Sequence, residues 1–234
     1  MKQKFFVALS VLLLCLSVCL SACGGHSGRS GGGADTIALA PCPVFEEDSA
    51  MMHIQAQCDF GPRVMGTEAA QLCGDYIAER FRQYGATVVE QNCTVTLYDD
   101  TKVPARNIIA SIHPEALDRI LFCAHWDSRP WADNDPDEAN WHTPILAAND
   151  GASGVAVLLE ICRLIQQKPV SRGIDFVCFD AEDAGPPEWA EDPADGRDTW
   201  CLGSQYWAQQ ALEANYKARY GVLLDMVGGR GCTF

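Results

Sequence analysis

Basic side chains are scarce in this chain, which has 17 Lys and Arg against 31 Asp and Glu and a net charge of −14. Loss of Lys2 and Lys4 with the N-terminal segment described below would leave −16, two units more negative. Such a charge repels nucleic acid and anionic membrane surfaces at long range, so neither is an expected partner. The same charge is compatible with a bound cation, with a substrate that carries a free amine, or with a role in solubility alone.

The first apolar segment, Phe5 to Leu20, is too short, and too soon followed by Gly and Ser, for a typical membrane-spanning helix. Because it follows Lys2 and Lys4, it is typical of a signal peptide, which we place at residues 1–22. Gly and Ser dominate from Gly24 to Asp35, and this composition predicts a flexible tether, which we place at residues 23–40.

The sequence Leu20-Ser21-Ala22-Cys23 resembles the bacterial lipobox, in which the Cys is diacylated and becomes the first residue of the mature protein. An ordinary secretory signal cleaved after a small residue is the alternative. With lipid on Cys23, we expect an exported protein that is anchored to a bacterial membrane and faces the periplasm.

No CxxC pair occurs among the 12 cysteines, which argues against a thiolate zinc site. An exported chain with this many cysteines would usually suggest disulfides. Four cysteines, however, lie where buried strands or apolar helix faces are predicted, and there a thiol behaves as a small hydrophobic group: Cys73, Cys123, Cys162 and Cys178. Five others could pair, but their spacing specifies no partners: Cys42, Cys58, Cys93, Cys201 and Cys232.

No internal repeat is present, and residues 41–234 are enough for one domain with a substantial core. Apolar periodicity and turn residues predict helices over residues 46–57, 67–84, 152–166 and 200–213. The predicted strands are 87–97, 105–112, 119–124, 174–179 and 220–227. Strands alternate with helices from residue 119 onward, which indicates an α/β fold with a mostly parallel sheet covered on both faces.

Residues with metal-binding or acid–base chemistry follow three of the predicted strands. In chain order, the candidate site residues are His125, Asp150, Glu182, Asp183 and Asp225. Ligands of open α/β sheets bind at the carboxyl ends of the strands, so these side chains are expected to meet. Imidazole and carboxylate ligands suit Zn²⁺ better than Mg²⁺ or Ca²⁺, which prefer oxygen ligands alone.

Each candidate also has a simpler interpretation. Asp150 precedes a helix and could be its N-cap, and His125 could be a hydrogen-bonded core histidine. Glu182 and Asp183 could form a solvated acidic corner. Asp225 is different, because it ends an apolar strand and is followed by Met226, so we expect it to be buried, where an unpaired carboxylate is costly.

Four motifs contain the candidate residues: His125-Trp126-Asp127-Ser128, Asn149-Asp150-Gly151-Ala152-Ser153-Gly154, Asp180-Ala181-Glu182-Asp183 and Leu224-Asp225-Met226. Together they resemble the zinc-dependent M28 aminopeptidase fold, which implies a three-layer α/β/α arrangement around a mostly parallel sheet. The combination HWDSRPWAD, NDGASG and FDAED is similar, more narrowly, to the bacterial glutaminyl cyclases of the animal type. The resemblance covers roughly residues 45 to 234.

The resemblance implies Asp150 and Asp183 as zinc ligands and Glu182 as the general acid and base. Asp225 would hold the proton network, and Trp189 would belong to the substrate pocket.

In di-zinc aminopeptidases of this fold the position of His125 binds a second metal, whereas in the cyclases it stays nearby without one. The family's third zinc ligand is a histidine well after Asp225, and this chain, which ends at Phe234, has no residue to match it. We therefore expect a fragment whose catalytic domain, residues 41–234, is incomplete at its C-terminus.

The implied activity is that of a zinc-dependent glutaminyl-peptide cyclotransferase acting on peptides or proteins with a free N-terminal Gln. An M28 aminopeptidase is the first alternative. The second is a lipoprotein of the same fold that binds without catalysis.

Overall fold

Five strands form one mixed sheet in the order β1-β2-β4-β3-β5 in the computed structural model, which describes residues 41–231. Their bounds are β1 Thr87–Thr96, β2 Lys102–Ile112, β3 Arg119–His125, β4 Gly173–Phe179 and β5 Gly221–Leu223. β2 is antiparallel to β1 and β4, whereas β4, β3 and β5 are mutually parallel. The predicted parallel part of the sheet is therefore confirmed. The predicted signal peptide, Cys23 and the tether lie outside the described residues.

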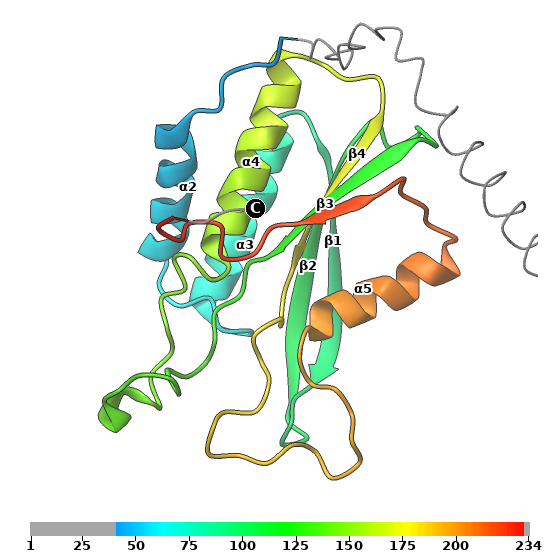
Figure 1. Ribbon diagram of the computed structural model, residues 1–234. Helices are drawn as coiled ribbons and strands as arrows, with labels where there is room; N and C mark the ends of the chain where they lie inside the picture. Colours follow the sequence, from blue (N-terminus) through cyan, green and yellow to red (C-terminus); the bar gives the residue numbers. More distant parts are fainter. Residues whose placement is uncertain (1–40, 232–234) are drawn as a thin grey trace, which may run out of the picture. The chain divides into compact units, whose positions relative to one another are not determined.

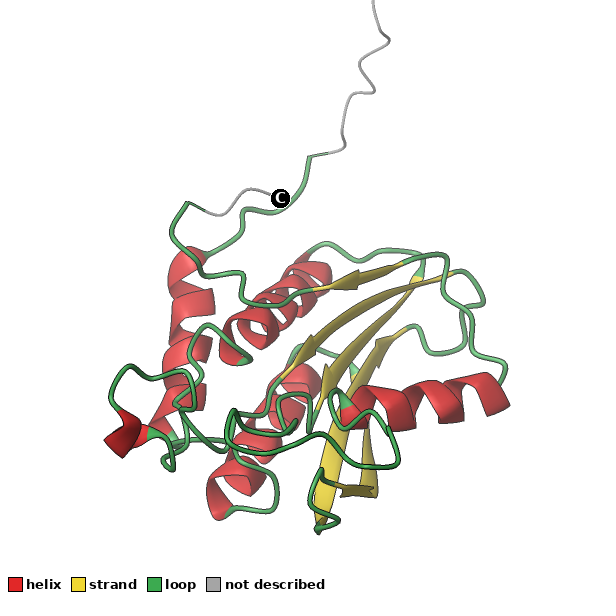
Figure 2. Cartoon of the chain, turned by 60° about the horizontal axis from the view of Figure 1, so that its bottom comes forward, coloured by secondary structure: helices red, strands yellow, loops and turns green. Residues whose placement is uncertain are grey.

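Helices cover both faces of this sheet, as predicted (Figures 1 and 2). α3 (Glu68–Gln83) and α4 (Ala152–Gln167) pack on one face, α2 (Glu47–Asp59) packs against α4, and α5 (Leu202–Glu213) packs on the other face. A short 3₁₀ helix, Glu138–Asn140, lies in the loop before α4. Among the described helices, none has the length and apolar character needed to cross a membrane.

The core lies between the sheet and α3 and α4, whose apolar stripes the sequence predicts. The α4 side chains Val155, Leu158 and Leu159 are fully buried. Phe176 of β4 stacks on Phe81 of α3 and on Phe122 of β3, with ring centroids 5.4 and 5.8 Å apart. Full burial of such a side chain contributes about 1.5–3 kcal/mol.

The described cysteines pack as thiols and form no disulfide with one another. Cys73, Cys162 and Cys178 are buried as predicted, whereas Cys123 is only half-buried. None of Cys42, Cys58, Cys93 and Cys201, whose pairing the sequence left open, is paired with another described cysteine. Cys232 lies outside the described residues.

The last strand differs most from its prediction, because β5 ends at Leu223 rather than at residue 227. The chain then turns toward the first turn of α4 and the loop before it. There the Val227 amide donates to Ser153 Oγ at 3.2 Å, and the Gly228 amide donates to Asn149 Oδ1 at 2.7 Å. These hydrogen bonds take the place of those that a longer β5 would have made with β3.

The expected burial of Asp225 is wrong, since its side chain is 46% exposed and Met226 is 52% exposed. β5 is an edge strand of the described sheet, and among residues 41–231 no element covers its outer edge. The predicted apolar surroundings of Asp225 are therefore missing from the described part of the chain.

Candidate metal centre

The imidazole of His125, at the end of β3, is the centre of a cluster of carboxylates. Its Nε2 lies 2.9 Å from Asp150 Oδ1 and 3.5 Å from Asp225 Oδ1. Its Nδ1 lies 3.4 Å from Asp127 Oδ1 and 3.8 Å from Glu182 Oε2. The structure thus brings together four of the five residues that the sequence proposes, and adds Asp127.

The donor atoms of this cluster fit a metal ion. One atom each from His125, Asp150 and Asp225 lie within 4.8 Å of one another. His125 Nε2 is buried, and its contacts lack the geometry of a hydrogen bond, so this nitrogen is unsatisfied in the protein alone. One imidazole and two carboxylates are a donor set that suits Zn²⁺.

The electrostatics of the cluster also favour a cation. Burial alone would lower the pKa of His125, but Asp127, Asp150 and Asp225 raise it to about 12. The nearby His125 imidazole in turn lowers the pKa of the Asp225 carboxyl below its usual range. Burial raises the pKa of Glu182, and His125 opposes this shift. A bound metal would satisfy the carboxylates that otherwise hold a proton on His125.

Asp127 fixes the loop after β4 beside the end of β3. His125 and Asp127 are two residues apart, so an extended backbone directs both side chains to the same side. Asp127 is completely buried, and its two oxygens accept from the amides of Glu182 and Asp183, each at 3.1 Å. No role is predicted for Asp127 from the sequence, although the period of two along an extended strand could have predicted its position.

The N-terminus of α4 approaches the strand ends closely, and two glycines make this possible. Gly151 has φ +104°, and a Cβ there would lie 2.7 Å from Asp127 O. A Cβ on Gly154 would lie 2.4 Å from Leu224 O. Gly151 is the N-cap of α4 and no side chain caps the helix, so the N-cap interpretation of Asp150 is wrong.

Asp183 points toward a cavity of about 480 Å³ that Asp150 also lines. Arg129 Nη1 donates to Asp183 Oδ1 at 3.1 Å, and Arg129 Nε donates to Asp133 Oδ1 at 2.7 Å. Burial raises the pKa of Asp183 to about 7, against the lowering effect of Arg129. The two zinc ligands implied by the resemblance therefore face one cavity.

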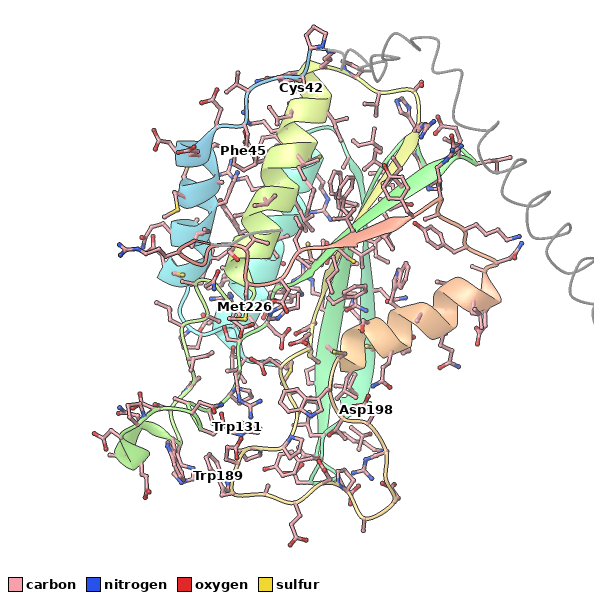
Figure 3. The ribbon with its side chains drawn as sticks, viewed as in Figure 1. Cys42, Phe45, Trp131, Trp189, Asp198 and Met226 are labelled. Carbon is pink, nitrogen blue, oxygen red and sulfur yellow. The ribbon has the colours of Figure 1, made fainter. Side chains whose placement is uncertain are left out.

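The indoles of Trp131 and Trp200 line this cavity. Trp189 does not line it but lies beside Trp131. Trp189 is 43% exposed and stacks on Trp141 with centroids 5.9 Å apart and planes at 13°. Its centroid is 6.5 Å from that of Trp131, and Figure 3 shows both in neighbouring loops. A pocket role for Trp189 stays a prediction.

Arg63 is a structural residue that the sequence analysis missed. It is completely buried and donates to three backbone oxygens: Nε to Trp126 at 3.0 Å, Nη1 to Leu146 at 2.7 Å and Nη2 to Ala147 at 2.7 Å. These bonds join the end of β3 to the loop before α4. No sequence signal marks this arginine, which follows a Gly-Pro turn and would ordinarily be exposed.

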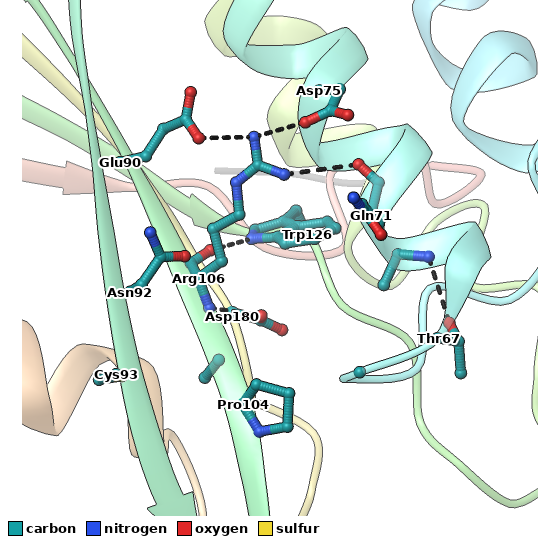
Figure 4. A pocket seen from close by; sticks show the side chains of 13 residues that line it. Thr67, Gln71, Asp75, Glu90, Asn92, Cys93, Pro104, Arg106, Trp126 and Asp180 are labelled. Atoms are coloured by element: carbon teal, nitrogen blue, oxygen red, sulfur yellow. Dashed lines mark hydrogen bonds and ion pairs between the residues drawn. The ribbon is translucent and has the colours of Figure 1, made fainter.

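Asp180, the first acid after β4, lines a second cavity of about 450 Å³ (Figure 4). Its Oδ2 accepts from the Arg106 amide at 2.8 Å, and Trp126 Nε1 donates to Arg106 O at 3.1 Å. The Arg106 guanidinium pairs with Asp75 and Glu90, each at 2.8 Å. Asp180 therefore lies apart from the candidate metal centre, whereas Glu182 contacts His125.

The fold is a three-layer α/β/α arrangement, and the carboxyl ends of its parallel strands carry one imidazole and several carboxylates. These features define the class of the protein as an α/β protein with a candidate metal centre. The chain belongs to peptidase family M28, whose family model matches residues 107–234.

Solved structures and a curated relative are similar to this chain. A Zn-dependent exopeptidase from Parabacteroides distasonis is 50% identical with a TM-score of 0.80, over 83% of this chain and 66% of that one. A glutaminyl cyclase from Tannerella forsythia is 53% identical with a TM-score of 0.78, over 82% of this chain and 65% of that one. The uncharacterized protein YfbL of Escherichia coli is 36% identical over 66% of this chain. The chain spans only 41% of YfbL's length.

Proposed function

We propose that the full-length protein is a zinc-dependent glutaminyl-peptide cyclotransferase, which converts the N-terminal Gln of peptides or proteins to pyroglutamate and releases ammonia. The observation that carries the proposal is the 53% identity with the Tannerella forsythia glutaminyl cyclase over 82% of this chain. It is supported by a cavity that Asp150 and Asp183 share, with two indoles in its wall.

In this proposal Glu182 moves the proton. It takes a proton from the substrate's α-amine as the amine attacks the side-chain amide carbon and the ring C–N bond forms. It returns that proton to the amide nitrogen, which leaves as ammonia when the old C–N bond breaks. General acid–base help of this kind contributes about 10²–10⁴-fold.

Other residues hold the participants in place. Asp150 and Asp183 would hold the zinc, which when bound supplies a Lewis acid for the amide carbonyl. Asp127 fixes the amides of Glu182 and Asp183, and Arg129 orients the Asp183 carboxylate. The indoles of the cavity exclude water from the bound glutamine.

An M28 aminopeptidase is the second candidate, and one observation favours it. His125, Asp150 and Asp225 can together hold a metal ion. The resemblance to di-zinc aminopeptidases implies that the position of His125 binds a second metal. The similar exopeptidase from Parabacteroides distasonis agrees with this candidate. The two candidates differ in metal content, with one zinc for the cyclase and two for the aminopeptidase.

The test uses the full-length protein with an N-terminal glutaminyl peptide and with peptides that begin with other residues. We expect ammonia release from the first, one bound zinc, and loss of activity with a chelator. Glu182→Gln should lower kcat by about 10²–10⁴-fold and keep the zinc. Glu191→Gln is the matched control, because Glu191 is an exposed glutamate of the same loop after β4 and does not line the cavity. Two metals and release of other N-terminal residues would establish the aminopeptidase, and inactivity on both would leave a binding lipoprotein.

A further inference from the structure

The thiol of Cys201 touches the carboxylate of Glu182. Cys201 Sγ donates a hydrogen bond to Glu182 Oε1 at 3.3 Å, while Glu182 Oε2 faces His125 at 3.8 Å. One carboxylate oxygen is therefore held by the thiol and the other is directed into the candidate metal centre. Burial and the nearby Glu182 raise the pKa of Cys201 to about 12, so the thiol stays a proton donor at neutral pH rather than a nucleophile.

Backbone hydrogen bonds to the segment that carries Glu182 fix the position of Cys201. The amides of Cys201, Leu202 and Gly203 donate to the carbonyls of Glu182, Ala181 and Asp180 at 2.8, 2.8 and 3.1 Å. The start of α5 is thus bonded residue by residue to the segment that carries Glu182.

Cys201 also occupies a conformation that glycine would adopt more easily. It has φ +54°, in the left-handed region that side chains other than Asn and Asp rarely adopt. Such strain persists when the surroundings fix it, and it is concentrated at functional sites. The backbone strain of a residue with a side chain at this position has to be offset by other interactions, and the contact with Glu182 is one of them.

We propose that Cys201 is a positioning residue for Glu182, whose thiol holds the carboxylate in the orientation that proton transfer requires. The inference rests on the proposed function, since it assigns Cys201 to the residue that moves the proton there. Cys201 itself need not touch the substrate.

The first test compares the kinetics of full-length variants on whichever substrate the wild type accepts. Cys201→Ala should lower kcat about tenfold, the effect of one hydrogen bond to a charged group, with KM unchanged. Cys201→Ser keeps a donor and should recover part of the loss. Cys58→Ala is the matched control, because Cys58 is a half-buried free thiol on α2. An unchanged kcat in Cys201→Ala, or a loss that serine does not restore, would overturn the proposal.

A second test does not depend on activity. The rate of alkylation of Cys201 is measured by mass spectrometry in the wild type and in Glu182→Gln. Removal of the negative charge beside the thiol should accelerate alkylation of Cys201 several-fold and leave that of Cys58 unchanged. If the protein is inactive on every peptide, the proposed function fails, and this rate still decides whether Cys201 and Glu182 interact. An equal rate in the two proteins would contradict the contact.

Discussion

At the scale of single residues, the site depends on positions where a side chain would not fit. A Cβ at Gly151 would meet the carbonyl oxygen of Asp127 at 2.7 Å and His125 Cε1 at 3.3 Å. Both neighbours are held by other contacts, so neither can move away without disturbing the cluster. Gly151 thus sets the distance between the end of β3 and the start of α4.

Gly151→Ala should therefore lower both the stability of the protein and its affinity for zinc. An alanine held at the Gly151 backbone angles, φ +104° and ψ −65°, costs about 1–3 kcal/mol in backbone strain, and the clash with Asp127 adds to this. Gly61→Ala is the control, because Gly61 has φ +95° but open space around its Cβ. Denaturant unfolding and zinc titration would measure the two effects. Equal losses of stability and unchanged zinc binding in the two variants would show that the close contact with Asp127 is unimportant.

At the scale of elements, one buried carboxylate joins four parts of the fold. Asp175 of β4 accepts from Arg119 of β3, from Ser111 of β2 at 2.6 Å and from the Tyr216 hydroxyl, after α5, at 2.7 Å. Burial would raise the pKa of Asp175, but these three donors outweigh it and lower the pKa below its ordinary value. The ionised form is therefore the one that the fold stabilises.

Asp175→Asn should destabilise the protein by about 3 kcal/mol, because it leaves the buried Arg119 guanidinium without its counter-charge. Since the folded pKa is depressed, this stabilisation is complete above the ordinary aspartate pKa of about 3.9 and is lost as the pH falls through the folded value. The difference in unfolding free energy between wild type and variant should thus shrink below about pH 4. Asp118→Asn, which removes an exposed carboxylate, should change little. A difference that does not vary with pH would refute the assigned charge.

The sequence predicts elements well where local pattern decides them and poorly where distant contacts do. The apolar stripe of α4 and the short apolar runs of β3 and β4 predict those elements to within about one residue. β5 ends early because the Val227 and Gly228 amides bond to Ser153 of α4 and to Asn149 in the loop before it instead of to a neighbouring strand, and no local pattern predicts these bonds. α5 begins two residues late because Cys201 is left-handed.

The same limit applies to the site. The rule that ligands gather at the carboxyl ends of parallel strands brings His125, Asp150 and Glu182 together from the sequence alone. Arg63 contacts backbone oxygens and Cys201 contacts a carboxylate, in each case many residues away in the chain, so composition and spacing do not predict these contacts.

At the scale of the whole molecule, we propose that the protein is exported and held on a bacterial membrane by lipid on Cys23. Each buried acyl methylene contributes about 0.8 kcal/mol, so two chains suffice for stable anchoring. Cys23→Ser should move the protein from the membrane fraction to the soluble fraction of cells that express the full-length chain. Cys19→Ser, inside the predicted signal peptide, is the control and should stay in the membrane fraction. Membrane retention of Cys23→Ser, or an unmodified Cys23 in mass spectrometry, would contradict lipidation.

The contacts of Arg63 also bear on the order in which the molecule assembles. Its side chain bonds to Trp126 and Ala147, 63 and 84 residues further along the chain. Contacts between such distant residues close long loops, whose entropy cost delays them during folding. The candidate metal centre, which shares these loops, therefore forms late, and a metal ion would bind to a folded site rather than to a partly folded chain.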